Sequence, residues 1–290
     1  MSGYIDLHVH SNYSDGKRSL EYIKNKVFEN NIRTIALAEH YNLSSYHEFR
    51  KLVGRDVEVI PATELSASLL NYGLSKKHIC HIVAYYPTDK IYSILDFYEL
   101  SRDKCVKRTI EMLKKQGVDI SFKEVINSAR NKESIGRFDI AIALSKKGLA
   151  PNPQSAYGIF FDENSPVYVD REKLPPGELI KNIINCKGVP VLVHPKSLRL
   201  NNSDFISFIS ELKSFGLCGI EVFNPHNTIE SIDFYKEVCD DFELIKTAGT
   251  DYHGRSNENI EIGCGIDNNL CIKDYSIIRN LKRRKKELYD

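Results

Sequence analysis

The chain has 290 residues, enough for one large domain or two small ones with a substantial buried core. Its 40 Lys and Arg residues balance 39 Asp and Glu residues. This near-neutral charge argues against binding of extended duplex nucleic acid, although it leaves room for a local phosphate pocket. Seven scattered cysteines without a C-x-x-C pair are typical of free thiols. With no signal-like start and no apolar run near the roughly 20 residues that cross a bilayer, we expect a soluble cytoplasmic protein without a membrane partner.

Predicted strands and helices alternate through the first part of the chain. Apolar alternation and continuous apolar runs predict strands at residues 4–11, 34–38, 57–60 and 79–85. Amphipathic spacing predicts helices at residues 19–30 and 45–53, the first with Ser19 as its N-cap. Such alternation is typical of parallel β/α units and predicts an α/β fold.

The alternation stops at about residue 91. Helical patterns follow at residues 91–116, 122–130 and 138–147, with no convincing strand between them. We therefore predict that residues 91–165 form an inserted helical subdomain. The parts before and after it, residues 1–90 and 166–290, would together form the main domain.

Strand and helix patterns resume after this segment. Strands are predicted at residues 189–193, 219–223 and 244–247, with helices at residues 177–186, 205–215 and 229–239. A last helix after Tyr275 contains the basic run 282–286, which we interpret as a solvated helix face.

The first predicted strand carries two histidines, His8 and His10, separated by one residue. Side chains two apart on a strand point to the same side, so both imidazoles could bind one divalent metal such as zinc, manganese or iron. Asp15, on a Ser-Asp-Gly turn, could reach the same point. On the His-x-His pair alone, two solvated histidines at a strand end remain an equally good interpretation.

Other histidines and carboxylates also fall at or just past the ends of predicted strands: His40, Glu64, His194, Asp251 and His253. In a parallel barrel those ends share one face, where active sites are built, so the pattern predicts a metal centre. Glu64 could instead be a loop carboxylate or a helix cap.

His81 is an exception, since it begins its apolar run. By pattern alone it is a core histidine, and His78 competes for the same role. His47 is predicted to lie on the surface, and His226 on the surface or behind the centre. Glu39 and Glu221 stand next to the predicted centre in the sequence, and we assign them to hydrogen bonds that orient the ligating imidazoles.

Taken together, these segments resemble the polymerase and histidinol phosphatase (PHP) family. That family has an Asp-Leu-His-x-His-Ser start, Ser-Asp-Gly, an acid-His pair, a Thr-x-Glu element, a His before an apolar run, His-Pro and a closing Asp-x-His. The matching residues, in order along nearly the whole chain, are His8, His10, Asp15, His40, Glu64, His81, His194, Asp251 and His253. The resemblance implies a distorted (β/α)7 barrel that binds three divalent metals at the strand ends, and it makes His81 a ligand.

The predicted helical subdomain narrows the resemblance. Residues 135–141 are similar to the Gly-Arg-Pro-His-Ile-Ala element of a branch that acts on AMP, 3′,5′-nucleotide bisphosphates or short RNA. Arg137 matches the arginine of that element, whereas Phe138 and Asp139 replace its Pro-His. Tyr41 stands where many relatives have an Asp after the histidine.

The resemblance also implies the chemistry. Glu64 would bridge two metals, one completed by His8, His10 and Asp251, the other by His81 and His194. Asp15, His40 and His253 would hold the third. A metal-bound hydroxide would attack the phosphorus atom, and no side chain is assigned to catalysis beyond it.

Four cations are candidates for substrate binding. Arg137 would clamp the phosphate, and Lys196, Arg199 and Arg255, which follow metal motifs, are weaker candidates; the alternative for all four is a solvated surface cation. The predicted function is metal-dependent hydrolysis of phosphate esters, with a nucleotide 5′-monophosphate, a 3′,5′-bisphosphate or a short 5′-phosphorylated RNA as substrate. Histidinol phosphate or a cyclic phosphodiester is the alternative substrate. A metal-binding regulatory module without turnover is the alternative from another class.

Overall fold

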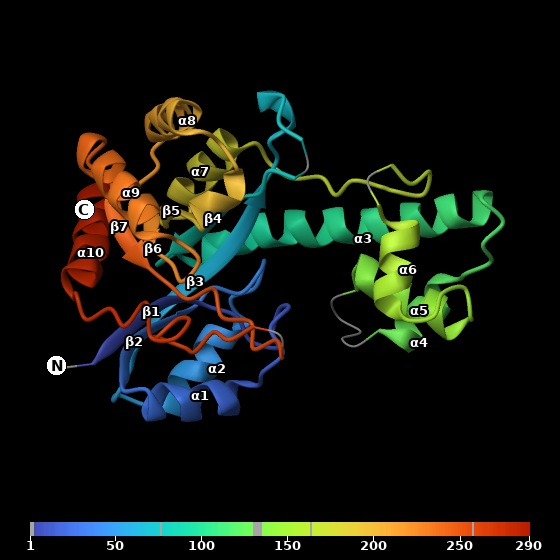
Figure 1. The fold of residues 1–290 in the computed structure, drawn as a ribbon, viewed down its shortest axis with the longest axis horizontal. Helices are drawn as coiled ribbons and strands as arrows, with labels where there is room; N and C mark the ends of the chain where they lie inside the picture. The colour runs from blue at the N-terminus through green and yellow to red at the C-terminus, as the bar shows by residue number, and fades with distance from the viewer. Residues whose placement is uncertain (1–2, 76, 130–134, 163, 257) are drawn as a thin grey trace. The chain divides into compact units, whose positions relative to one another are not determined.

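The computed structural model describes residues 3–75, 77–129, 135–162, 164–256 and 258–290 (Figure 1). The chain divides into two compact units. Met1–Ile94 together with Leu174–Asp290 form what we name the barrel unit, and Leu95–Lys173 form the helical unit. None of the described helices combines the length and the apolar character of a bilayer-spanning segment.

The barrel unit is built on a seven-stranded sheet whose strands follow one another in chain order. The strands are β1 (Tyr4–Val9), β2 (Ile32–Leu37), β3 (Glu58–Ala67), β4 (Cys80–Tyr85), β5 (Val189–Val193), β6 (Gly219–Phe223) and β7 (Ile245–Ala248). The sheet curls until its two edges meet just past β7, where Val9 bridges Tyr252 and the Asp251 N–H donates to the His8 carbonyl at 2.8 Å. This partial closure makes the fold a distorted barrel, as predicted.

One strand runs against the predicted parallel pattern. β1, β2 and β3 pair in parallel, as do β5, β6 and β7, but β4 is antiparallel to both β3 and β5. Among its described residues, the link from β3 to β4 contains the 3-10 turn η1 (Leu70–Tyr72) but no crossover helix of the kind that usually joins parallel strands. The first residues of β4 therefore lie at the edge of the sheet where the parallel strands end.

Helices pack against the outside of the curled sheet (Figure 1). They are α1 (Leu20–Glu29), α2 (Ser44–Val53), α7 (Pro176–Asn185), α8 (Asn202–Ser214), α9 (Ile229–Asp241) and α10 (Ser276–Tyr289), with 3-10 turns η2 (Asp89–Ile91) and η3 (Pro195–Leu198). Ser19 caps α1 as predicted, accepting the Tyr22 N–H at 3.3 Å. The helix then buries Leu20, Ile23 and Val27, one apolar stripe at helical spacing.

The helical unit contains most of α3 (Tyr92–Lys115), together with α4 (Phe122–Ser128), α5 (Arg137–Lys146) and α6 (Pro153–Phe160). Their apolar faces share a core that includes Ile110, Leu113, Ile140 and Leu144. The predicted helices match α3, α4 and α5, except that Arg130, the expected end of the second, lies outside the described residues. Helix α6 was not predicted.

Candidate metal centre

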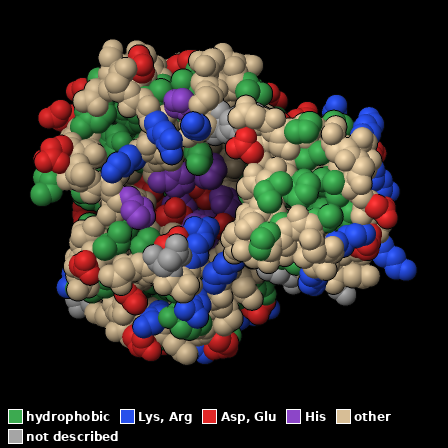
Figure 2. All heavy atoms as spheres, turned by 45° about the vertical axis from the view of Figure 1, so that its right-hand side comes forward, with side chains coloured by type: hydrophobic (Ala, Val, Ile, Leu, Met, Phe, Trp, Pro, Cys, Tyr) green, Lys and Arg blue, Asp and Glu red, His purple; other side chains and the backbone are tan. Residues whose placement is uncertain are grey.

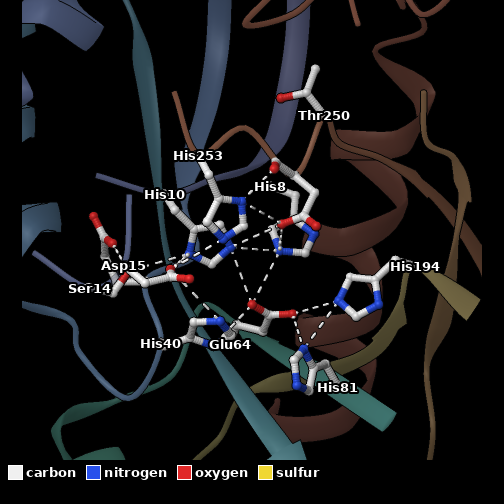
Figure 3. Close-up of polar contacts among 12 residues, drawn as sticks. His8, His10, Ser14, Asp15, His40, Glu64, His81, His194, Thr250 and His253 are labelled. Carbon is white, nitrogen blue, oxygen red and sulfur yellow. Dashed lines mark hydrogen bonds and ion pairs between the residues drawn. The ribbon is translucent and has the colours of Figure 1, made fainter. Parts of the chain in front are cut away.

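All nine predicted ligands converge at the edge of the sheet where the parallel strands end. Figure 3 shows Glu64 in the middle of this centre, with imidazoles from several strands directed toward it. The nine side chains fall into four overlapping groups whose potential ligand atoms lie within 4.8 Å of one another. We name this set the nine-residue centre. Its members are His8, His10, Asp15, His40, Glu64, His81, His194, Asp251 and His253.

Glu64 is buried, and its side chain is 1% exposed. It lies inside β3, which continues to Ala67, so the prediction that it follows the strand is wrong. Its Oε2 lies 3.2 Å from Nε2 of His10, 3.2 Å from Nδ1 of His40 and 3.5 Å from Nε2 of His8. One carboxylate oxygen thus faces three imidazoles.

The other oxygen of Glu64 faces two more imidazoles. Oε1 lies 2.8 Å from Nδ1 of His81 and 2.8 Å from Nε2 of His194, and these two nitrogens are 3.2 Å apart. His81 is the second residue of β4 and pairs with Ser66, two residues past Glu64. Because β4 is antiparallel, a histidine at its beginning reaches the same place as the histidines that end the other strands.

Asp251 joins His8 and His10 on one side of Glu64. The two Nε2 atoms are 3.2 Å apart, and Asp251 Oδ1 lies 3.5 Å from His8 and 3.2 Å from His10. Ligands bound at about 2.0–2.2 Å to a single ion lie about 3–3.6 Å from one another, so this spacing fits a metal.

Asp15 lies on the opposite side, with His253 and His40. Its Oδ1 is 3.2 Å from Nε2 of His253 and 3.9 Å from Nε2 of His40. Asp15 Oδ1 and His40 Nδ1 are both buried, and neither meets hydrogen-bond geometry with any described residue. Buried polar atoms are almost always satisfied, so two such atoms facing one centre fit a place for cations.

Hydrogen bonds behind the centre fix the orientation of four imidazoles. His8 Nδ1 donates to Glu221 Oε1 at 2.9 Å, and His253 Nδ1 to the Asp251 carbonyl at 2.8 Å. His194 Nδ1 donates to Ser197 Oγ at 2.9 Å, because that hydroxyl gives its own proton to the Ile79 carbonyl. With Nδ1 protonated, Nε2 carries the lone pair that a metal needs.

The fourth imidazole, His10, is held through a chain of side chains. Its Nδ1 lies 3.4 Å from Ser14 Oγ, and that hydroxyl donates to Glu39. Glu39 is fully buried and also accepts the Ser11 N–H at 3.1 Å. The predicted hydrogen bond between Glu221 and an imidazole is therefore confirmed, whereas Glu39 bonds to Ser11 and Ser14 and reaches His10 through Ser14.

Burial and opposite charges shift the pKa values of the centre. Burial alone would raise the pKa of Glu64, but the surrounding imidazoles hold it well below its usual range. Burial alone would lower the pKa of His10, but the Asp251 and Glu64 carboxylates raise it to about 10. His40 is different, since burial lowers its pKa to about 4. Without metal, the Glu64 carboxylate is thus stabilised in its ionised form and His10 in its protonated form, whereas His40 is stabilised in its neutral form.

Asp6 is a further buried carboxylate that the sequence analysis did not single out. Its side chain is fully buried and accepts Thr250 N–H at 3.0 Å, Thr250 Oγ1–H at 2.7 Å and Gly263 N–H at 2.8 Å. Burial raises the pKa of Asp6 to about 6. These hydrogen bonds link β1 to the loop that carries Asp251. The sequence feature that could have identified Asp6 is a single charged residue within an apolar strand.

The candidate substrate-binding cations have different surroundings. Arg255 donates to Asp15 Oδ2 at 3.2 Å, beside the nine-residue centre. Lys196 donates to the His226 carbonyl at 2.9 Å. Arg199 is exposed and lines a pocket next to His194. Figure 2 shows histidine and acidic side chains in a hollow, with Lys and Arg side chains around it.

Arg137 belongs to the helical unit and begins α5. Its guanidinium lies 4.9 Å from the ring centroid of Tyr168. Asp139, which replaces a histidine of the related branch, is buried and accepts the Gly136 N–H at 2.9 Å. That carboxylate therefore caps the helix, which accounts for an acid at this position.

The remaining histidines lie outside the nine-residue centre. His78 bonds to Ser75, and His47 lies on α2 against the Tyr46 ring. His226 is exposed, and its backbone carbonyl accepts a hydrogen bond from Lys196. His47 is exposed, as predicted. His78 does not belong to any of the groups of potential ligand atoms, so it does not take the place of His81.

Comparison with known proteins agrees with this geometry. The PHP domain model matches residues 6–157, more than half of the chain. The chain belongs to the PHP domain family. Relatives of this PHP protein include a phosphoribosyl 1,2-cyclic phosphate 1,2-diphosphodiesterase of Eggerthella lenta, 23% identical over 89% of the chain and 97% of the relative.

Two further relatives are also phosphoesterases. A 5′-3′ exoribonuclease of Haemophilus influenzae is 22% identical, over 92% of this chain and 96% of its own. A 3′,5′-nucleoside bisphosphate phosphatase of Chromobacterium violaceum is 21% identical, over 89% and 90%. A crystal structure from Bifidobacterium adolescentis, described as a metal-dependent phosphoesterase, superposes with a TM-score of 0.71 at 22% identity, covering 98% of this chain and 97% of that one. This PHP protein is a metal-dependent phosphoesterase.

Proposed function

We propose that this PHP protein hydrolyses phosphate esters of nucleotides, namely 5′-monophosphates, 3′,5′-bisphosphates or short 5′-phosphorylated RNA. The observation that carries the proposal is the nine-residue centre. Within it, one carboxylate oxygen of Glu64 faces three imidazoles and the other oxygen faces two. Two of the relatives act, by name, on RNA and on a nucleoside bisphosphate, which supports a nucleotide substrate.

In this proposal the centre would hold three divalent cations. Glu64 would contribute to two of the sites, the first with His8, His10 and Asp251 and the second with His81 and His194. The third site consists of Asp15, His40 and His253. Imidazole nitrogens mixed with carboxylate oxygens suit manganese, iron or zinc.

Bound cations would supply a lowered pKa for water and neutralisation of charge on the phosphate. The protein's own part is to orient and to bind. Glu221 and Ser197 hold His8 and His194 with Nε2 directed toward Glu64. Arg255, held beside Asp15 at 3.2 Å, would meet a phosphate oxygen at the edge of the centre.

Three further cations complete the proposed substrate contacts. Lys196 and Arg199 follow His194 on η3 and its C-terminal end, and we assign them to the part of the substrate beyond the scissile phosphate. Arg137 is proposed as a clamp from the helical unit. Guanidinium groups bind two phosphate oxygens at once, which favours arginine for these positions.

A hydrolysis screen with manganese tests the proposal. It would compare AMP, a 3′,5′-bisphosphate, short 5′-phosphorylated RNA, histidinol phosphate and a cyclic phosphodiester. We expect turnover of a nucleotide substrate that falls at least about 100-fold in His194→Ala, since a ligand should cost no less than the 10–100-fold typical of its supporting residues. His47→Ala, on the surface of α2, is the matched control.

Three outcomes would contradict the proposal. Equal activity in His194→Ala and the control would remove the centre from the reaction. Turnover confined to histidinol phosphate or to the cyclic diester would move the substrate to the alternative class. Tight metal binding without any turnover would favour a regulatory module.

A further inference from the structure

A pocket of about 310 Å³ lies within the barrel unit, at the loop that follows the candidate ligand His194. Its lining includes Pro195 and Lys196, the two residues that follow His194, and continues into the first turns of α8 and α9. Helices that follow β5 and β6 begin at the face where those strands end. The pocket therefore lies on the same face of the barrel as the candidate ligands.

Two cations stand at this pocket. Arg199 is exposed, and its backbone adopts a left-handed φ of 51° that ends η3 and turns the chain toward α8. Lys196 donates to the His226 carbonyl at 2.9 Å, which links the loop after β5 to the loop after β6. Glu230 is the one acid that lines the pocket among the described residues, so cationic groups outnumber it.

The rest of the lining combines the polar side chains of Asn202 and Ser231 with apolar and aromatic ones. Phe234 is partly exposed, and its ring packs 5.7 Å from that of Phe205 and 5.6 Å from that of Tyr235. Phe205 and Tyr235 are buried, so they hold the Phe234 ring in place from behind. A fixed, partly exposed aromatic ring is a surface on which a nucleobase can stack.

The combination is specific in its chemistry. A second phosphate alone would need only the two cations, and a purely apolar ligand would need only the rings. A nucleotide unit uses both, with its phosphate on Lys196 and Arg199 and its base on Phe234. The pocket volume is at the small end of ligand sites, which suits one such unit.

We propose that this pocket binds the second nucleotide of a short 5′-phosphorylated oligonucleotide, the unit that follows the one whose ester bond reacts at the metal centre. The inference rests on the proposed function and makes it narrower, because a single mononucleotide would leave the pocket unused. It assigns to Phe234 a role in choosing the substrate.

The test compares 5′-phosphorylated diadenylate with AMP in the wild-type protein, Arg199→Ala and Phe234→Leu. We expect kcat/KM for the dimer, relative to that for AMP, to fall about tenfold in each variant, mainly through KM, as a base stack or a charge-assisted bond is worth about 1.5 kcal/mol. Arg283→Ala on α10 and Phe28→Leu on α1, two exposed positions on elements that do not line the pocket, are the matched controls. An unchanged ratio in both pocket variants would overturn the inference.

Binding of the same dimer to metal-stripped protein separates this inference from the proposed function. If no substrate is turned over but Arg199→Ala and Phe234→Leu weaken dimer binding about tenfold, the pocket stands and the proposed reaction falls. If the dimer is hydrolysed while its affinity is the same in both variants as in the controls, the reaction stands and the pocket assignment is wrong.

Discussion

Replacing Glu221 with glutamine should weaken metal binding, although Glu221 is not itself a candidate ligand. The Glu221 carboxylate accepts His8 Nδ1–H at 2.9 Å, the His194 N–H at 2.8 Å and Asn224 Nδ2–H at 3.1 Å, and it is 1% exposed. Glutamine has one carbonyl oxygen. Whichever way it is oriented, its NH2 group faces at least one of these N–H donors, and a buried donor loses its acceptor.

The magnitude follows from that lost bond. A hydrogen bond to a buried charged group is worth about 1.5–3 kcal/mol, and residues that support metal ligands typically change affinity 10–100-fold. Glu221→Gln should therefore bind manganese about 10–100-fold more weakly, with a lower unfolding free energy even without metal. Titration calorimetry on chelator-stripped protein measures the first, and urea unfolding the second. Glu237→Gln, exposed on α9, is the control.

Manganese affinity within twofold of the wild type, in a variant with an unchanged circular dichroism spectrum, would refute this reasoning. It would mean that a single amide oxygen behind His8 supports metal binding as well as the carboxylate does.

Three further changes follow from particular contacts. Gly249→Ala should cost about 1–3 kcal/mol of stability and weaken metal binding, because a Cβ there would lie 2.2 Å from His8 Cβ; an unfolding curve and calorimetry check both. Tyr41→Phe removes the 2.5 Å bond from its hydroxyl to Ser66 and should lower metal affinity a few-fold, as the ring stacks on a candidate ligand. In chelator-stripped protein, stability should fall as pH rises from about 6.5 to about 10, because the raised pKa of His10 means that the folded state holds a proton that unfolding releases.

Each of these has an outcome that contradicts it. Wild-type stability and affinity in the Gly249 variant would mean that this backbone is not packed on β1 as described. An effect of Tyr41→Phe that is fully retained on top of Ser66→Ala would show that the two hydroxyls do not act together. Stability of the stripped protein that rises between pH 6.5 and 10 would reverse the expected sign; saturating manganese, which needs neutral imidazoles, should abolish the expected fall.

The candidate ligands were predictable because histidines and acids at strand ends break an apolar pattern at regular places. His8, His10 and His194 end or follow runs of buried residues, where a polar side chain has no packing role. Strand direction was not predictable from periodicity, because a strand pairs with either orientation using the same alternation. The link between the strands predicted at residues 57–60 and 79–85 is long enough for a crossover, so it gave no signal; the link is shorter in the structure because β3 continues to Ala67.

His81 illustrates the consequence. Its position at the start of an apolar run argued for a core residue as long as β4 was taken as parallel. In the antiparallel strand that same position reaches Glu64. Helix α6 was missed although the sequence contains its start signals. Asn152 accepts the Ser155 N–H at 2.8 Å, and Pro153 lies in the first turn, but the helix has only eight residues, too few for a clear amphipathic pattern.

The buried carboxylates behind the centre were only partly predictable. Glu39 and Glu221 stand next to candidate ligands in the sequence, so their supporting role could be inferred. The partners of Asp6 are Thr250 and Gly263, more than 240 residues away along the chain. No local pattern encodes contacts of that separation, because they depend on the closing of the barrel.

The most direct test of the proposed centre is anomalous diffraction at the manganese edge from crystals grown with manganese. We expect three peaks, each about 2.0–2.3 Å from side-chain atoms of the nine-residue centre, two of them sharing the Glu64 carboxylate. Crystals grown with excess manganese that show no peak within reach of Glu64 would contradict the account.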